Sequence, residues 1–243
     1  MLYNLVQRLI KKISKNYKNY KRQKKFSSII NYLLNKKLKI NTIYDVGAFR
    51  GHWTNQLNRT CLKDKDFYLF EANIENEPYL KKYDHKYFIK TLSDKVKNVK
   101  FYSNASTGDS YYLEQTNIYK NKITPKIKKT STLDIIRKVN KLPLPDFLKI
   151  DTQGSEIDIL KGGKKTLKKC KIILLECPII SYNKGAPILD EYIKYLNILG
   201  FLPFDVCEIH RIDDVFVQVD IIFLKKKLFK KINKKKKILK IFN

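Results

Sequence analysis

The sequence of 243 residues predicts an α/β fold built on a mostly parallel sheet. From residue 40 onward, apolar runs of four to eight residues alternate with helical segments, which is the pattern of parallel strands joined by crossover helices. Two of these runs end in a carboxylate and lead into a glycine-containing turn, at residues 45–51 and 151–154. Ligands of open α/β sheets bind at the carboxyl ends of the strands, so we expect the functional site there.

The individual elements follow from the hydrophobic periodicity between residues 42 and 224. The predicted strands are 42–46, 67–71, 87–92, 147–151, 171–176, 201–208 and 215–224, with 99–102 as a further candidate. The predicted helices between them are 53–59, 132–139, 155–161 and 188–199. Residues 103–130, rich in Ser, Asn, Thr and Tyr, form a long insertion, and insertions of this length usually carry binding loops.

The positive charge is concentrated at the two ends of the chain. Lys and Arg number 51 against 23 Asp and Glu, which gives a formal net charge of +28. Residues 1–40 contribute +12, residues 225–243 contribute +10, and the region between them contributes about +6. We therefore predict a basic helical extension at 1–40, one main domain at 41–224 and a Lys-rich solvated tail at 225–243. The excess charge reflects either an anionic partner or a compositional bias toward Lys, Ile, Asn and Tyr.

The N-terminal residues favour a surface helix and a cytoplasmic protein. Residues 2–13 place apolar side chains on one helix face and basic side chains on the other, and a second helix is predicted at 26–38. The first helix either packs on the domain or docks on an anionic membrane, which would make the protein peripheral on the inner membrane surface. No apolar run is long enough to span a bilayer. Four cysteines without a CxxC spacing indicate reduced thiols and no zinc site.

The motif IYDVGAFRG, at residues 43–51, indicates a turn that binds a nucleoside. Its D-x-G-x-x-x-G spacing departs from the G-x-G-x-x-G of dinucleotide sites, and Asp45 would repel a pyrophosphate but would suit a cationic ligand. The second strand ends in Glu71, where a carboxylate can accept two hydrogen bonds from a ribose diol. The pair suggests S-adenosylmethionine as the cofactor.

The motif FLKIDTQGSEIDILKGG, at residues 147–163, brings Asp151 to the same edge of the sheet and then enters a helix that Ser155 is predicted to cap. Together with DVGAFRG, LFEA (69–72), TLSD (91–94), STLD (131–134), LLEC (174–177) and QVDIIF (218–223), this block resembles the FkbM family of S-adenosylmethionine-dependent methyltransferases. The resemblance covers residues 42–224 in the family's order. It implies a class I, Rossmann-like methyltransferase fold for the main domain, with a seven-stranded sheet, an antiparallel last strand and helices on both faces.

The resemblance also implies a set of site residues. Cofactor-binding positions would be Asp45, Gly47, Ala48 and Gly51 around the methionine moiety, Glu71 and Ala72 at the ribose, Ser93 and Asp94 near the adenine, and Asp151 beside the methyl group. Two positions depart from the family pattern, because Phe49 replaces the usual Asn of the first turn and Gln153 replaces a frequent Glu. The implied reaction is methylation of oxygen in sugars, polyketides and related metabolites.

Methyl transfer to a hydroxyl requires alignment of the acceptor and removal of its proton. Asp151 is the first candidate for the proton acceptor, Glu176 at the end of the next strand is the second, and His210 is the third. Asp151 could instead orient its loop or hold the cofactor amine. We expect no metal, although Asp151 and Glu176 would be the ligands of a divalent ion if one took part.

Three other functions remain open from the sequence. A nicotinamide-dependent sugar oxidoreductase would share the sheet, but the third glycine of its fingerprint and a Tyr-x-x-x-Lys dyad are missing beside the first turn. An RNA-binding methyltransferase would suit the basic ends, but base-amine enzymes carry Pro-Pro-aromatic where this chain has Asp-Thr-Gln-Gly. A noncatalytic protein of the same fold is the third alternative. Tyr111, Tyr112 and Tyr119 of the insertion are candidates to stack on a sugar or glycan acceptor.

Overall fold

The computed structural model describes residues 25–103, 107–116 and 123–233, and the chain divides into two compact units, residues 1–38 and 39–243. In the first unit residues 25–35 are helical, in agreement with the helix predicted at 26–38. The predicted basic helix at 2–13 lies outside the described residues. Within the described ranges, no helix combines the length and the apolar character that crossing a membrane requires.

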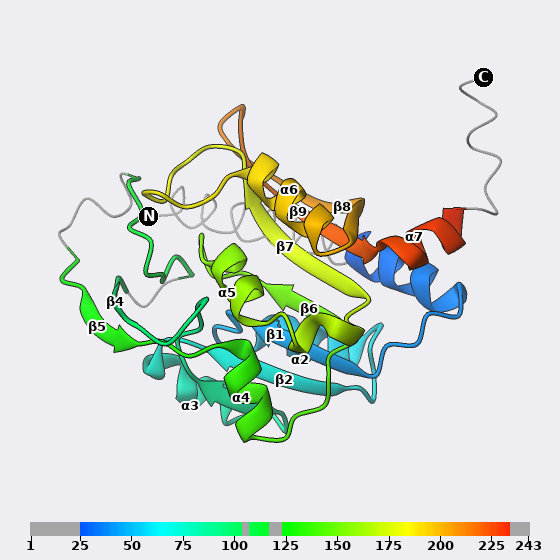
Figure 1. Ribbon diagram of the computed structural model, residues 1–243, viewed down its shortest axis with the longest axis horizontal. Coiled ribbons are helices and arrows are strands. Elements are labelled where there is room, and N and C mark those ends of the chain that lie inside the picture. The colour runs from blue at the N-terminus through cyan, green and yellow to red at the C-terminus, as the bar shows by residue number, and fades with distance from the viewer. Residues whose placement is uncertain (1–24, 104–106, 117–122, 234–243) are drawn as a thin grey trace, which may run out of the picture. The chain divides into compact units, whose positions relative to one another are not determined.

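The second unit is built on a seven-stranded sheet in the order β3-β2-β1-β6-β7-β9-β8 (Figure 1). The strands are β1 (Thr42–Val46), β2 (Asp66–Glu71), β3 (Lys86–Ile89), β6 (Phe147–Ile150), β7 (Ile172–Pro178), β8 (Phe201–Ile212) and β9 (Val215–Lys225). β1, β2, β3, β6 and β7 pair in parallel, whereas β9 is antiparallel to both β7 and β8. The predicted class I, Rossmann-like fold with an antiparallel last strand is confirmed.

The strand order reverses between β1 and β6, and this is the position at which open α/β sheets bind their ligands. β1 and β6 are buried on both faces because helices cover both, which explains why most of their residues are apolar. The backbone N–H of Asp151 donates to the carbonyl of Val46 at 3.0 Å and extends this pairing past the end of β6. The loops after β1 and β6 therefore leave the sheet side by side.

Helices cover both faces of the sheet. One face carries α4 (Leu133–Val139), α5 (Glu156–Gly162) and α6 (Leu189–Ile198), as Figure 1 shows. Their buried side chains join those of the strands, among them Tyr44, in one continuous core. The opposite face carries α2 (His52–Arg59), where the Trp53 ring packs edge-on against Phe147 and the Thr54 hydroxyl reaches Asp45. Side chains alternate along a strand, so Tyr44 and Asp45 face opposite layers.

The candidate strand predicted at 99–102 is confirmed as β4 (Asn98–Phe101). Five regions differ from the sequence-based expectation. The insertion contains a strand, β5 (Lys126–Lys129), which pairs with β4 in antiparallel orientation. A 3-10 turn (Ile74–Asn76) and helix α3 (Glu77–Leu80) follow β2, and a further 3-10 turn (Thr166–Lys169) follows α5. β8 extends to Ile212, so His210 lies within this strand and not in a loop beyond it.

The fifth difference lies in the region that was predicted to be a solvated Lys-rich tail. Residues Lys226–Asn233 form helix α7 directly after β9. The Phe229 ring packs edge-on against Phe204 of β8 with the ring centres 6.3 Å apart, and Ile232 is buried. Leu228 and Ile232 share one helix face, a spacing that the surrounding lysines hid in the sequence.

Candidate functional site

A pocket opens at the carboxyl ends of β1, β2 and β6, where the strand order reverses. We call it the switch-point pocket; its space between the atoms is about 540 Å³, including the part open to solvent. Most of its lining residues lie within 46–49, 70–72, 90–92, 107–111 and 151–155. Four residues predicted to bind the cofactor contribute to the lining: Gly47, Glu71, Ala72 and Asp151. These four residues therefore lie together at the edge of the sheet where the site was expected, whereas the other five predicted cofactor residues do not line the pocket.

The turn after β1 adopts a backbone that few residues tolerate. Gly47, Phe49 and Gly51 all have positive φ, at 73°, 50° and 74°. A Cβ at Gly47 would lie only 1.8 Å from the carbonyl oxygen of Asp151, so glycine is required for the turn to touch the neighbouring loop. Asn adopts positive φ more readily than Phe, which explains why Asn is the family's usual residue where this chain has Phe49.

Glu71 fixes this turn from the side of β2. Its Oε2 accepts a hydrogen bond from the Phe49 backbone N–H at 2.7 Å, and its Oε1 accepts from the Asn73 N–H at 2.7 Å and from Asn76 Nδ2 at 3.3 Å. Burial raises the pKa of Glu71, while these three donors favour the charged carboxylate. A carboxylate offers about four acceptor positions, so Glu71 retains capacity for a ligand hydroxyl at the pocket wall.

The loop after β3 supports the pocket from behind. Ser93 is fully buried, and its hydroxyl contacts Asp94 Oδ1 at 3.0 Å and the Tyr111 hydroxyl at 3.1 Å. Tyr111, which lines the pocket, also donates to Asp158 Oδ2 at 3.1 Å. A Cβ at Gly162 would lie 2.2 Å from the Ser93 carbonyl, so the end of α5 presses directly on this loop. Ser93 and Asp94 thus lie behind the residues that form the pocket surface.

The insertion contributes polar groups that the sequence analysis did not single out. Asp109 lines the pocket and accepts from Asn73 Nδ2 and from the Ser103 hydroxyl, both at 2.8 Å. Tyr112 donates to Asp158 at 3.0 Å, so its ring is held beside α5. Tyr119 lies outside the described residues. Proximity of Asp109 to Glu71 could not be inferred from the chain, because the two residues belong to separate segments.

The loop after β6 is held by a buried carboxylate. Glu156 accepts from the backbone N–H groups of Thr152 at 2.8 Å and Gly154 at 3.0 Å, and from the Tyr192 hydroxyl at 2.6 Å. The predicted capping role of Ser155 is wrong: Ser155 occupies the N-cap position of α5, but its hydroxyl donates to Thr152 Oγ1. The free N–H groups of this loop are taken by the stronger charged acceptor, Glu156.

A chain of polar contacts links Asp151 to Glu176. Gln153 Nε2 donates to Glu176 Oε1 at 2.7 Å and to Asp151 Oδ1 at 3.2 Å. The side chain of Asp151 is 33% exposed and lines the pocket, whereas Glu176 does not. Burial raises the pKa of Glu176 well above its usual range, and the negative charges of Asp151 and Asp220 add to this effect. Gln153, the departure from the family pattern, therefore bridges two of the three predicted catalytic residues.

The third predicted catalytic residue joins the same group. His210 Nε2 lies 3.3 Å from Asp220 Oδ1 and 3.6 Å from Glu208 Oε2. One potential ligand atom each from Glu176, His210 and Asp220 lies within 4.8 Å of the others, and this is the one such three-residue group that the described ranges contain. Two carboxylates and an imidazole can hold a divalent ion or share a proton. Asp220 was missed because its strand reads as apolar.

A buried lysine is the most prominent residue that the sequence analysis missed. Lys149, in β6, lies 3.1 Å from Asp45 Oδ1 and 3.4 Å from Asp151 Oδ2, and it donates to the Gly47 carbonyl at 3.1 Å. Asp45 is fully buried, accepts from the Thr54 hydroxyl at 2.7 Å and does not line the pocket. Its carboxylate therefore faces α2 and Lys149. The nearby opposite charges raise the pKa of Lys149.

Comparisons with known proteins identify the family to which the chain is similar. A family model described as the methyltransferase FkbM domain matches residues 45–203. A solved methyltransferase FkbM from Methylobacillus flagellatus KT is 15% identical with a TM-score of 0.49, covering 75% of this chain and 43% of that one. Magnesium protoporphyrin IX methyltransferase (ChlM) from Synechocystis PCC 6803, solved with bound SAM, is 8% identical with a TM-score of 0.48, and the match covers 85% of this chain and 80% of that one. No curated protein sequence matches the chain.

Proposed function

The chain belongs to the FkbM methyltransferase family, and from this premise we propose that it transfers a methyl group from S-adenosylmethionine to a hydroxyl of a sugar or glycan. The chain spans less than half of the Methylobacillus protein that it matches. The observation that carries the proposal is the position of Asp151. It lines the switch-point pocket and is linked through Gln153 to the buried Glu176, so a carboxylate stands at the pocket edge where an acceptor can enter.

The pocket residues suit S-adenosylmethionine. Phe70, Leu92 and Phe101 provide apolar surface for a purine, and Glu71 and Asp109 provide acceptors for ribose hydroxyls or an ammonium group. The wall has no Lys or Arg other than Lys90 among its described residues, which fits a nucleoside without phosphates better than a dinucleotide. When bound, the cofactor supplies a methyl group activated by its sulfonium.

The residues of the β6 loop would align the acceptor and receive its proton. The acceptor oxygen bonds to the methyl carbon as the carbon–sulfur bond breaks, and the hydroxyl proton passes to a carboxylate. Asp151 is the base that we propose, because a general base must reach the proton before its pKa matters, and Glu176 and His210 do not line the pocket.

Oxygen methylation is favoured over base methylation by the loop after β6. Its residues Asp151, Thr152, Gln153 and Gly154 offer polar groups and no aromatic platform for a flipped base. Labelled methyl transfer from S-adenosylmethionine to cell-envelope glycan fractions, with unrelated RNA as the comparison acceptor, tests the assignment. Label in the glycan fraction that survives mild acid is expected, and label in RNA alone would contradict the proposal.

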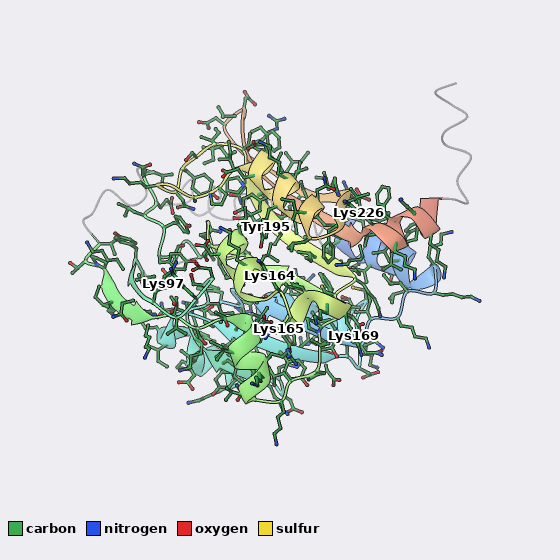
Figure 2. All side chains as sticks on the ribbon, in the orientation of Figure 1. Lys97, Lys164, Lys165, Lys169, Tyr195 and Lys226 are labelled. Carbon is green, nitrogen blue, oxygen red and sulfur yellow. The ribbon has the colours of Figure 1, made fainter. Side chains whose placement is uncertain are left out.

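We further propose a peripheral contact of the basic surface with anionic membrane at the inner surface of the cell, as the support for a lipid-linked acceptor. In α7 the apolar side chains of Phe229 and Ile232 pack against the domain, and Lys227, Lys230 and Lys231 are exposed. Figure 2 shows Lys164, Lys165 and Lys169 on a different part of the domain, along the segment that joins α5 to β7.

These two lysine groups give a matched pair of variants for a vesicle test. Each basic side chain near an anionic surface contributes about 1 kcal/mol, and the effect is lost at high salt. Co-sedimentation of the full chain with anionic vesicles should fall when three α7 lysines are changed to Gln and should persist in the control. The α7 variant changes Lys227, Lys230 and Lys231, and the control changes Lys164, Lys165 and Lys169, all of them exposed. Equal loss in both would show a nonspecific charge effect and would contradict docking through α7.

A further inference from the structure

Lys149 occupies a position that is unfavourable for a lysine. It is the third residue of β6, at the centre of the sheet, and its side chain is 8% exposed. Removing an ammonium group from water costs several kcal/mol unless charged and polar partners replace the water. Hydrophobic residues fill the neighbouring positions of this strand, Leu148 and Ile150. A lysine in this place therefore needs a specific set of partners.

The partners of Lys149 come from three segments of the chain. Its Nζ atom lies 3.1 Å from Asp45 at the end of β1, 3.1 Å from the Gly47 carbonyl in the turn, and 3.4 Å from Asp151 in the loop after β6. An ammonium carries three protons, so three acceptors satisfy it. The Trp53 ring, 5.5 Å from Nζ, covers it from the α2 side.

These contacts join the two functional loops. The turn at Gly47 already touches the Asp151 carbonyl so closely that no side chain fits between them. Backbone packing fixes how near the loops lie, and the Ala48 N–H, which donates to the Phe70 carbonyl at 3.1 Å, holds one side of the peptide group that carries the Gly47 carbonyl. The other side of this peptide group and the Asp151 carboxylate depend on side-chain partners. Lys149 contacts both groups with one atom, and Asp45 holds that atom in place.

We propose that Lys149 is a positioning residue, which sets the glycine turn for the cofactor and the Asp151 carboxylate for the acceptor through one shared ammonium group. The inference rests on the proposed function of the switch-point pocket and assigns a residue that touches neither ligand. Removal of the ammonium alone would leave Asp45 buried without its ion-pair partner, and such a change strongly destabilises a protein. The test must separate that loss of stability from the loss of positioning.

A series of three variants makes the separation. Asp45→Asn keeps the shape of the side chain and leaves Lys149 with the Gly47 carbonyl and Asp151. The double variant combines Asp45→Asn with Lys149→Met. It removes the ammonium from a site that no longer contains the Asp45 charge, so the fold is retained. Lys171→Met is the control, because Lys171 is a partly buried lysine paired with Asp146 at 2.6 Å at the opposite end of the strands.

The readouts are the thermal midpoint of each variant and the Kd for S-adenosylhomocysteine by calorimetry at 25 °C. Lys171→Met should bind within about threefold of wild type. The double variant should bind at least tenfold more weakly than Asp45→Asn at a similar thermal midpoint, and each factor of ten in Kd corresponds to about 1.4 kcal/mol. Equal affinity of Asp45→Asn and the double variant would overturn the inference.

Other outcomes are also decisive. A tenfold loss already present in Asp45→Asn, with no further loss on adding Lys149→Met, would show that Asp45 is the functional group and would also overturn the inference. Wild type that fails to bind S-adenosylhomocysteine would contradict the proposed function itself. If wild type binds S-adenosylhomocysteine and the double variant binds it with the same affinity, only the role of Lys149 is refuted.

Discussion

Gly47→Ala tests the contact on which the switch-point pocket depends. Gly47 has a φ of 73°, and an added Cβ would lie 1.8 Å from the carbonyl oxygen of Asp151, although such contacts are essentially never shorter than 3.0 Å. The turn and the β6 loop would therefore have to separate by more than an ångström. Displacements of about 1 Å in a functional site can lower the reaction rate by about 100-fold. We expect cofactor affinity to fall by about that factor.

Gly185→Ala is the matched control for the cost of placing a non-glycine residue at positive φ. Gly185 has nearly the same φ, 74°, but a Cβ there would meet nothing within 4 Å. Gly185→Ala should lose only the stability that a non-glycine residue loses at positive φ, about 1–2 kcal/mol. Each kcal/mol lowers the thermal midpoint by about 2–4 °C in a chain of this size. Thermal unfolding and calorimetric titration with S-adenosylhomocysteine measure both effects. Similar affinity in the two variants would refute the reasoning, because strain alone would then explain both.

Three further predictions concern the carboxylates of the site. Glu71→Gln should weaken cofactor binding by about 1.5–3 kcal/mol, the value of a hydrogen bond to a charged group, as measured by calorimetry. Burial raises the pKa of Glu71, so the cofactor affinity of wild type should fall on acidification as the carboxylate gains its proton. The affinity of the Gln variant should not change with pH in the same range. Parallel pH profiles of affinity for the two proteins would exclude Glu71 from binding. Asp151→Asn should reduce labelled methyl transfer by about 100-fold with little change in cofactor Kd. Poor binding with normal turnover at saturation would place Asp151 in the cofactor site instead. Dialysis against a chelator should leave methyl transfer intact, and loss that Mg²⁺ or Mn²⁺ restores would establish a metal at Glu176, His210 and Asp220.

The strands and the antiparallel last strand could be predicted because their signals are local or belong to the family pattern. Apolar runs marked the strands to within a few residues, and the DVGAFRG and KIDTQGSE motifs placed two loops at the correct edge of the sheet. α7 was missed because only Leu228, Phe229 and Ile232 interrupt its lysines. Helix α3, of four residues, is too short for a periodic pattern to appear.

The inner arrangement of the site required three-dimensional contacts. Lys149 reads as an ordinary strand residue until β1 and β6 are paired and Asp45 is seen opposite it. Asp45 reads as a ligand-facing carboxylate, yet the alternation of side chains turns it toward α2. Asp220 and His210 lie close together across the β8–β9 hairpin, and Glu176, which is distant in sequence, joins them because β9 inserts between β7 and β8.

Calorimetric titration of the full-length protein with S-adenosylhomocysteine, beside an identical titration with NAD, tests the central claim most directly. The switch-point pocket predicts saturable binding of S-adenosylhomocysteine with a stoichiometry near one per chain, and no saturable heat with NAD. The Glu71 carboxylate, the Gly47 turn and the near-absence of basic residues in the pocket wall all require this result. Binding of NAD, or folded protein that shows no heat with S-adenosylhomocysteine, would contradict it.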